Sequence, residues 1–97
     1  MIKHVFAYFN ELGGFFGKPI FSEFKDDFVK EITQSLYGAN QETLESLSDD
    51  SLYYLGTFDN ETGLLESKKE FVASLSPICK EVLLKKFGVK KDARDKN

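Results

Sequence analysis

The segment between residues 52 and 65 constrains the fold more strongly than any other part of the chain, because it has the pattern of a complete β-hairpin. Residues 52–58 are mostly aromatic or aliphatic, which favours a strand that is largely covered. Residues 59–62 form a polar turn cluster, and Gly63 follows where a hairpin loop commonly needs a positive φ. The pattern predicts two antiparallel strands, and with them a fold that contains a sheet.

A second hairpin is predicted at the N-terminal end. Residues 2–9 are apolar on both faces of an extended chain, which is typical of a central strand. The glycine pair at 13–14 indicates a turn, and residues 15–21 return as a second strand. Because proline cannot donate a hydrogen bond to a neighbouring strand, Pro19 puts this second strand at an edge of the sheet or at its own end.

One helix is expected between the two hairpins. Ser22 is a candidate N-cap, and the helix is expected to run to about residue 37 before Gly38 ends it. Residues 40–47 are expected to form a further helical turn. The buried stripe of the main helix consists of apolar residues that recur every four positions, namely Phe24, Phe28, Ile32 and Leu36.

The C-terminal third is interpreted as helical. Ser67 and Glu70 have the spacing of a capping box, which predicts a short helix over residues 68–75. Pro77 is placed to begin a second helix, and Gly88 to end it. The order is therefore β-β-α-β-β followed by a helix. This is an α+β fold in which two β-hairpins flank a central helix, with a four-stranded, mostly antiparallel sheet and a C-terminal helix.

The length of the chain sets its domain organisation. A chain of 97 residues makes one domain. We expect this domain to span residues 1–88, and residues 89–97 to form a charged, flexible tail.

The composition argues against several classes of site. Cys79 is the only cysteine, so no disulfide forms within the chain, which favours a reducing compartment. His4 is the only histidine, and the sequence offers neither a zinc site nor a catalytic constellation around it. No stretch approaches the ~20 apolar residues of a membrane span, and the apolar run at the start is too short for a signal peptide. We expect a soluble, intracellular protein that is not an enzyme and has no cofactor, no metal ion and no membrane contact.

Charge is distributed unevenly along the chain. Residues 1–67 hold four lysines and twelve acidic residues, a balance of −8, whereas residues 68–97 hold nine Lys or Arg and four acidic residues, a balance of +5. A basic segment on an acidic body is a pattern for contact with a polyanion. The alternative is a solvated helix end, where lysines complement the helix dipole.

Residues 52–63, Leu-Tyr-Tyr-Leu-Gly-Thr-Phe-Asp-Asn-Glu-Thr-Gly, resemble the signature of a phage family. That family is the small non-structural, DNA-binding-type protein of gokushovirus-like Microviridae, phages whose genome is single-stranded DNA. Its pattern is an apolar pair, then Gly-Thr-Phe-Asp, a polar pair and Thr-Gly. The N-terminal strand, the segment at 19–21 and the acidic pair at 49–50 agree with it, so the likeness covers roughly residues 1–66.

The resemblance implies a non-structural protein that is made during phage infection, in the host cytoplasm. It implies a counterpart of the small protein that switches related phages from duplex DNA replication to single-strand synthesis and DNA packaging. The implied partners are single-stranded DNA, a phage or host replication protein, or the procapsid.

Binding of single-stranded DNA needs cations along the backbone and exposed aromatic rings for the bases. Tyr53 and Tyr54 are adjacent on a strand, so they point to opposite faces and at most one belongs to the core. The single arginine and the acidic body predict weak, non-specific and salt-sensitive binding. The candidate nucleic-acid-binding residues are Lys80, Lys85, Lys86, Lys90, Lys91, Arg94, Tyr53, Tyr54 and Tyr8, with Phe16 as a further aromatic candidate.

A protein–protein interaction module is the alternative. Strands with aromatic residues on both faces leave one face of the sheet without a cover, which a second copy would supply. In that case the chain is a homodimer formed through its sheet, and its basic C-terminal helix docks an acidic partner.

Overall fold

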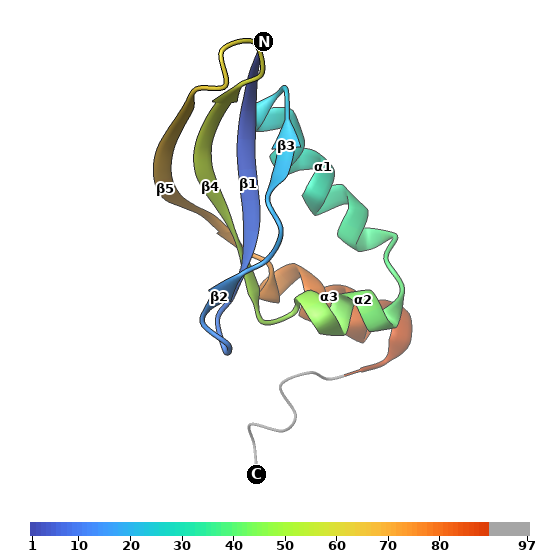
Figure 1. Cartoon of the computed structure of the whole chain (residues 1–97). Coiled ribbons are helices and arrows are strands. Elements are labelled where there is room, and N and C mark those ends of the chain that lie inside the picture. Colours follow the sequence, from blue (N-terminus) through green and yellow to red (C-terminus); the bar gives the residue numbers. More distant parts are fainter. Residues whose placement is uncertain (90–97) are drawn as a thin grey trace.

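The computed structural model describes residues 1–89, in which an antiparallel sheet packs against three helices (Figure 1). The predicted α+β class is confirmed. The expected tail falls almost wholly on residues 90–97, which lie outside the described residues. The elements are β1 (Ile2–Asn10), β2 (Phe15–Phe16), β3 (Ile20–Ser22), α1 (Lys25–Tyr37), α2 (Gln41–Leu47), β4 (Asp50–Asp59), β5 (Leu65–Ser74) and α3 (Ser76–Phe87).

The centre of the sheet is formed by β1 and β4. The strand order is β2-β1-β4-β5, and β3 also pairs with β1. The two central strands are antiparallel along their whole length, with Ile2 opposite Asp59 and Asn10 opposite Asp50. The predicted second strand is divided, because the segment at 17–19 contains Pro19 and leaves the pairing. β2 therefore pairs with the end of β1 and β3 with its beginning, and the sheet has five strands instead of four.

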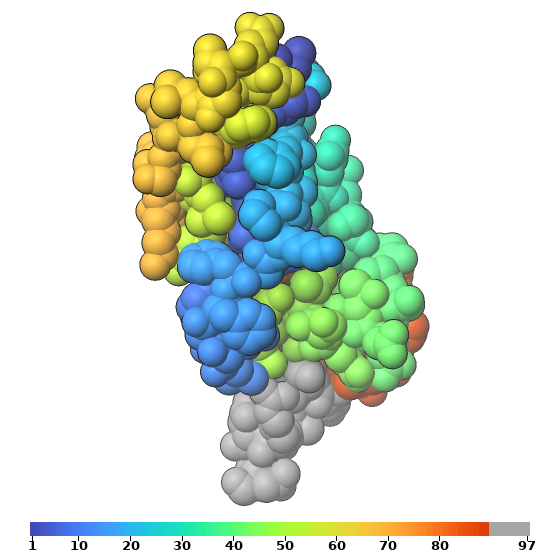
Figure 2. Space-filling view, viewed as in Figure 1, coloured from blue at the N-terminus to red at the C-terminus, as the bar shows by residue number. Residues whose placement is uncertain are grey.

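Helix α1 lies along one side of the sheet, which we call the helical side, and α2 and α3 lie together at the lower end of the sheet (Figure 1). Phe28 of α1 stacks on Phe6 of β1, with ring centres 4.4 Å apart. Tyr8 contacts both this cluster and a second one that joins the helices to each other. In Figure 2 the strands form the surface on the left and in the centre, and α1 appears only at the right edge. The second cluster contains one buried leucine from each helix: Leu36, Leu44 and Leu83.

Residues 68–75 do not form the predicted helix. Residues 65–74 instead form β5, which pairs with β4 from Leu65 opposite Phe58 to Ser74 opposite Ser51. A helix of two turns is marginal by itself, whereas the edge of β4 satisfies the backbone of a whole strand. Pairing with the neighbouring strand therefore overrides the local capping-box signal.

The main helix begins later than predicted. Phe24 occupies the N-cap position, and its side chain makes no capping hydrogen bond. Ser22 lies before the helix, where its Oγ accepts a hydrogen bond from the Phe24 N–H at 3.3 Å. Phe24 is consequently outside the buried stripe and is 64% exposed, whereas Phe28 and Leu36 are buried as predicted.

The C-terminal helix is confirmed with its predicted end, and it begins at Ser76, one residue before the predicted first position at Pro77. Pro77 lies in the first turn of α3, and Gly88 ends the helix with a left-handed φ of 67°. Cys79 is fully buried in the cluster between the helices, and burial raises the pKa of its thiol.

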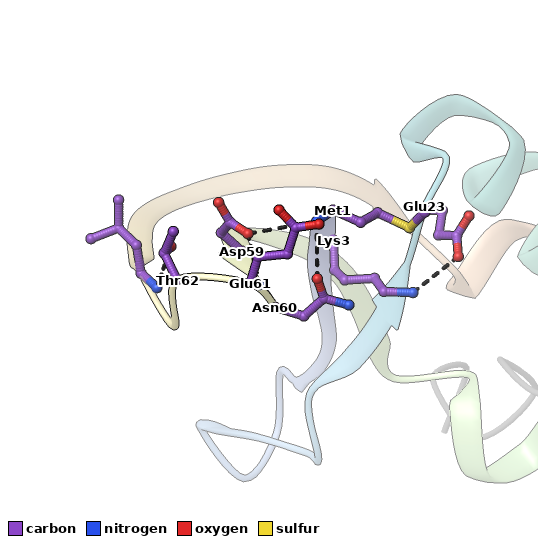
Figure 3. A network of polar contacts seen from close by, with 8 residues as sticks. Met1, Lys3, Glu23, Asp59, Asn60, Glu61 and Thr62 are labelled. Atoms are coloured by element: carbon purple, nitrogen blue, oxygen red, sulfur yellow. Dashed lines mark hydrogen bonds and ion pairs between the residues drawn. The ribbon is translucent and has the colours of Figure 1, made fainter.

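The turn between β4 and β5 has the geometry that its sequence predicts (Figure 3). Gly63 has a φ of 76°, and the Asp59 carboxylate accepts a hydrogen bond from the Glu61 N–H at 2.9 Å. This hydrogen bond is the main reason that the pKa of Asp59 is lowered. The Met1 nitrogen donates to Asn60 Oδ1 at 3.0 Å and lies 3.4 Å from the Glu61 carboxylate. Residues 59–63 of the family-like signature thus close the hairpin and hold the beginning of β1.

Candidate functional site

A band of aromatic rings crosses the side of the sheet that faces away from the helices. Neighbouring residues of a strand point to opposite faces, so Phe9 lies on this side because Tyr8 lies on the helical side. Phe9 is opposite Phe16 of β2, and its ring also contacts Tyr53 of β4, which is opposite Phe71 of β5. We call the four residues Phe9, Phe16, Tyr53 and Phe71 the aromatic face.

The four rings of the aromatic face hold each other in position. Ring centres are 4.7 Å apart for Phe9 and Phe16, 5.4 Å for Phe16 and Tyr53, and 5.7 Å for Tyr53 and Phe71. The last two contacts are edge-to-face, a favoured arrangement for aromatic pairs. Phe71 is 55% exposed and the other three are half-buried, so the band is both ordered and open to a ligand.

One cation lies beside these rings. The Lys69 Nζ is 5.7 Å from the ring centre of Phe16 and 5.9 Å from that of Tyr53. Lys69 is exposed, and within residues 1–89 it has no carboxylate partner. An ammonium group next to aromatic rings is the combination that contacts a phosphate beside a stacked base.

A second pair of rings extends the apolar surface toward the other end of the sheet. The ring centres of Phe21 and Phe58 are 6.0 Å apart, and Phe21 is 54% exposed. Phe21 is opposite Val5 in the β1–β3 pairing, and Val5 and Ala7 are buried in the centre of the same face. Soluble proteins rarely expose large apolar patches except at interaction sites, so these rings favour an interaction site on this face.

The two adjacent tyrosines point to opposite faces, as predicted. Tyr53 belongs to the aromatic face. Tyr54 is a core residue, with 5% of its surface exposed, and its hydroxyl lies 2.8 Å from His4 Nδ1. The ammonium group of Lys25 covers its ring at 4.2 Å from the centre. Tyr54 is therefore corrected from a candidate stacking residue to a packing residue.

Tyr8 is also on the helical face. It is half-buried between the two core clusters. Burial raises the pKa of its hydroxyl, and the negative charge of Asp50 raises it further. Tyr8 therefore does not share a surface with Tyr53, and bases that stack on the aromatic face do not contact its ring.

Three of the predicted lysines are on α3, which packs against α1 and α2. Lys85 donates a hydrogen bond to Glu81 at 2.9 Å, and this contact raises the pKa of Lys85. Lys86 donates to the backbone carbonyl of Tyr37, and Lys80 is half-buried. The remaining predicted cations, Lys90, Lys91 and Arg94, lie outside the described residues.

The structure does not gather the predicted site residues into one surface. Residues 1–89 contain nine lysines and fourteen acidic residues, a formal net charge of −5. The cations expected on one basic segment are divided, because Lys68 and Lys69 belong to β5 and three others to α3. Within the described part of the chain, the lysines of α3 are therefore separated from Tyr53, with which they were grouped.

The sequence reasoning missed three residues of this surface, namely Phe9, Phe71 and Lys69. Phe71 and Lys69 fall in the segment predicted as a helix, which hides their place on the sheet. Phe9 is recognisable as a strand residue, and its position opposite Phe16 follows from a register that a single sequence does not give. The available signal is the alternation of Lys69 and Phe71, two positions apart, which share a face only if residues 68–75 are extended.

Comparisons with protein-family models, curated proteins and solved structures gave no significant match. Residues 1–89 contain no helix with the length and apolar character of a membrane span. These residues also contain no group of three or more His, Cys, Asp or Glu side chains that is arranged to hold a metal ion.

Proposed function

We propose that this chain is a non-enzymatic, single-stranded-DNA-binding protein that acts in a phage's switch from duplex replication to single-strand synthesis and packaging. The aromatic face is the surface on which the bases stack. The observation that carries the proposal is a set of four contacting rings on an uncovered sheet face, with the Lys69 ammonium group beside two of them. The switch role itself rests on the resemblance of residues 52–63, and it places the protein in the host cytoplasm.

The charges of the chain predict how this binding behaves. A formal charge of −5 over residues 1–89 opposes the approach of a polyanion. Stacking, by contrast, is worth ~1–3 kcal/mol per base and does not need a strongly basic surface. We therefore expect weak binding that is sequence-tolerant along the aromatic face and sensitive to salt.

The test is the affinity of an oligo-dT strand for a Phe71→Ala variant, measured by fluorescence anisotropy at low salt. Removing one stacking ring should weaken binding roughly 5- to 150-fold. Phe24→Ala is the matched control, because Phe24 is 64% exposed, compared with 55% for Phe71, but precedes α1. Equal affinities of Phe71→Ala and the unchanged protein would reject the aromatic face as the binding surface.

Docking of a protein is the second candidate function. It is favoured by the net negative charge of residues 1–89 and by two phenylalanines, Phe21 and Phe71, that are each more than half exposed on this side of the sheet. The occupant would be a second copy, a replication protein or the procapsid. Sedimentation at several concentrations tests the homodimer. A molecular mass that rises to twice the monomer mass as the concentration increases, together with a monomer mass for Phe71→Ala at every concentration, would favour this function.

A further inference from the structure

A small cavity lined by both aromatic and polar residues lies near the aromatic face, on the other side of the sheet. Its volume is about 260 Å³. It adjoins the paired residues Asn10 and Phe15, which neighbour Phe9 and Phe16 of the aromatic face. At this edge the two surfaces lie on opposite sides of β1 and β2. The cavity is lined by Tyr8, Asn10, Phe15, Gly17, Ser46 and Asp50.

The polar groups of this cavity have hydrogen-bonding capacity to spare. The Asp50 carboxylate accepts one hydrogen bond, from Asn10 Nδ2 at 3.0 Å, and a carboxylate has about four acceptor sites. Among the described residues, the hydroxyls of Tyr8 and Ser46 have no hydrogen-bond partner. The cavity thus presents a free carboxylate edge beside two hydroxyls that are able to donate.

The carboxyl group of Asp50 lies where burial disfavours its charged form. Burial is the main cause that raises the pKa of Asp50, and the neighbouring carboxylates of Asp49 and Glu11 raise it further. A donor pair from a ligand would compensate this carboxylate, since hydrogen bonds to a charged acceptor are the strong ones. The walls suit a planar ligand, because Tyr8 and Phe15 contribute aromatic rings.

We propose that this cavity binds the Watson–Crick edge of one guanine in the bound single strand. Guanine is the base that offers two adjacent N–H donors, N1–H and the N2 amino group, together with the acceptor O6 on the same edge. The two donors match the free edge of the Asp50 carboxylate, and O6 accepts from the hydroxyl of Tyr8 or Ser46. Recognition of the Watson–Crick edge is available because the bases of a single strand are unpaired.

This inference rests on the proposed function and adds selectivity to it. Bases on the aromatic face stack without regard to sequence. A strand that leaves this face over Phe16 meets the cavity beside Phe15, so the next base is read there. We expect binding to be sequence-tolerant over most of the strand and guanine-selective at one position.

The cavity is tested directly with mononucleotides, followed through the backbone amides in ¹H–¹⁵N NMR spectra. We expect dGMP to shift the amides of Gly17, Ser46 and Asp50, and dAMP, dCMP and dTMP to leave them nearly unchanged. Asp50→Asn should weaken the dGMP response at least about tenfold, which is the discrimination of a good bidentate pair. Asp49→Asn is the matched control, because it removes the same charge from the adjacent residue, which does not line the cavity.

A second arm uses an oligo-dT strand and the same strand with one central guanine. The guanine should raise affinity for the unchanged protein and for Asp49→Asn, but not for Asp50→Asn. Phe71→Ala should weaken both strands equally. A dGMP response without oligonucleotide binding would support the cavity and reject the proposed function. Equal responses to all four mononucleotides would overturn the inference. Binding of an arginine amide in place of dGMP would also overturn it, because a guanidinium group likewise offers two N–H donors to a carboxylate.

Discussion

Gly56, in the middle of the family-like signature, is a residue whose identity the backbone dictates. Its φ is 133°. The preceding residue, Leu55, has no partner in β1, so the pairing of β1 and β4 is irregular at this point. A Cβ at this position would lie 2.0 Å from the carbonyl oxygen of Glu66, which is part of the paired strand and unable to move away. The glycine therefore lets β4 and β5 approach each other at a bulge.

We expect Gly56→Ala to lower the free energy of unfolding by more than about 2 kcal/mol, because it combines backbone strain with a clash. Gly63→Ala measures the cost of backbone strain alone, because Gly63 has a φ of 76° and a methyl group there would meet no atom within 4 Å. It should cost only about 1 kcal/mol. Urea denaturation measures both, and equal losses would show that the contact with Glu66 does not matter.

Asp50 should make stability depend on pH in a direction opposite to that of most carboxylates. Burial raises its pKa in the folded protein above the ordinary value. The folded state therefore holds the proton more tightly than the unfolded state does, and Asp50 costs stability at pH values above its folded pKa. This cost fades as the pH falls through the folded pKa toward the ordinary value.

The Asp50→Asn variant should consequently be more stable than the unchanged protein at pH 7, and the difference should shrink toward pH 4. An asparagine keeps the hydrogen bond from Asn10, because its amide oxygen is also an acceptor. Thermal unfolding across this pH range is the measurement. A variant that is less stable at pH 7 would mean that the carboxylate is compensated by contacts within the protein itself.

At the scale of elements, those with strong local signals were predictable, and the part of β5 from residue 68 onward was not. The hairpin turn, the first turn of α3 with Pro77 and the end of α3 at Gly88 each depend on a residue whose backbone preference is nearly sufficient. Residues 65–74 are mostly exposed, so they lack the alternation of a half-buried strand. These residues form a strand because they pair with the open edge of β4, and the local sequence does not reveal this pairing.

The short helix α2 tests how much one cap contributes. It has only seven residues, and the Asn40 side chain accepts a hydrogen bond from the Thr43 N–H at 2.8 Å. Asn40→Ala should destabilise the protein by about 1 kcal/mol. Ser22→Ala should cost less, because Ser22 precedes the N-cap residue of α1 instead of occupying it. Equal losses in urea denaturation would contradict this assignment of the caps.

At the scale of the whole molecule, the candidate site was predictable in kind but not in place. Composition indicated that aromatic rings and lysines were available, and the adjacency of Tyr53 and Tyr54 correctly allowed at most one of them to be a core residue. Which lysine lies beside which ring depends on strand order and register. Lys69 falls with Lys68 in the segment predicted as a helix, yet the sheet brings it to Phe16, more than fifty residues away in the chain.

The salt dependence of DNA binding separates the two possible positions of the cationic contact. If α3 provides it, replacing Lys85 and Lys86 together with glutamate should abolish the dependence. If the aromatic face provides it, the contact is made by Lys69, which lies beside Phe16 and Tyr53, so Lys69→Glu should weaken binding of oligo-dT and lower the slope of log K against log salt by about 1. The double variant should then keep most of its slope, since these two lysines lie on α3 and already contact Glu81 and Tyr37.

Lys68→Glu is the control for this prediction, because it makes the same charge change one residue away. Lys68 lies 3.8 Å from Glu70, which in turn pairs with Lys25 beside the core ring of Tyr54, so its side chain belongs to the helical side of β5. A long-range effect of net charge would lower the affinity of both variants alike, whereas a contact on the aromatic face makes Lys69→Glu distinctly weaker. The opposite result would be equal slopes of log K against log salt for Lys69→Glu and Lys68→Glu, with no slope for the variant that replaces Lys85 and Lys86 with glutamate. In that case the DNA contacts α3, and the aromatic face is left for a protein partner.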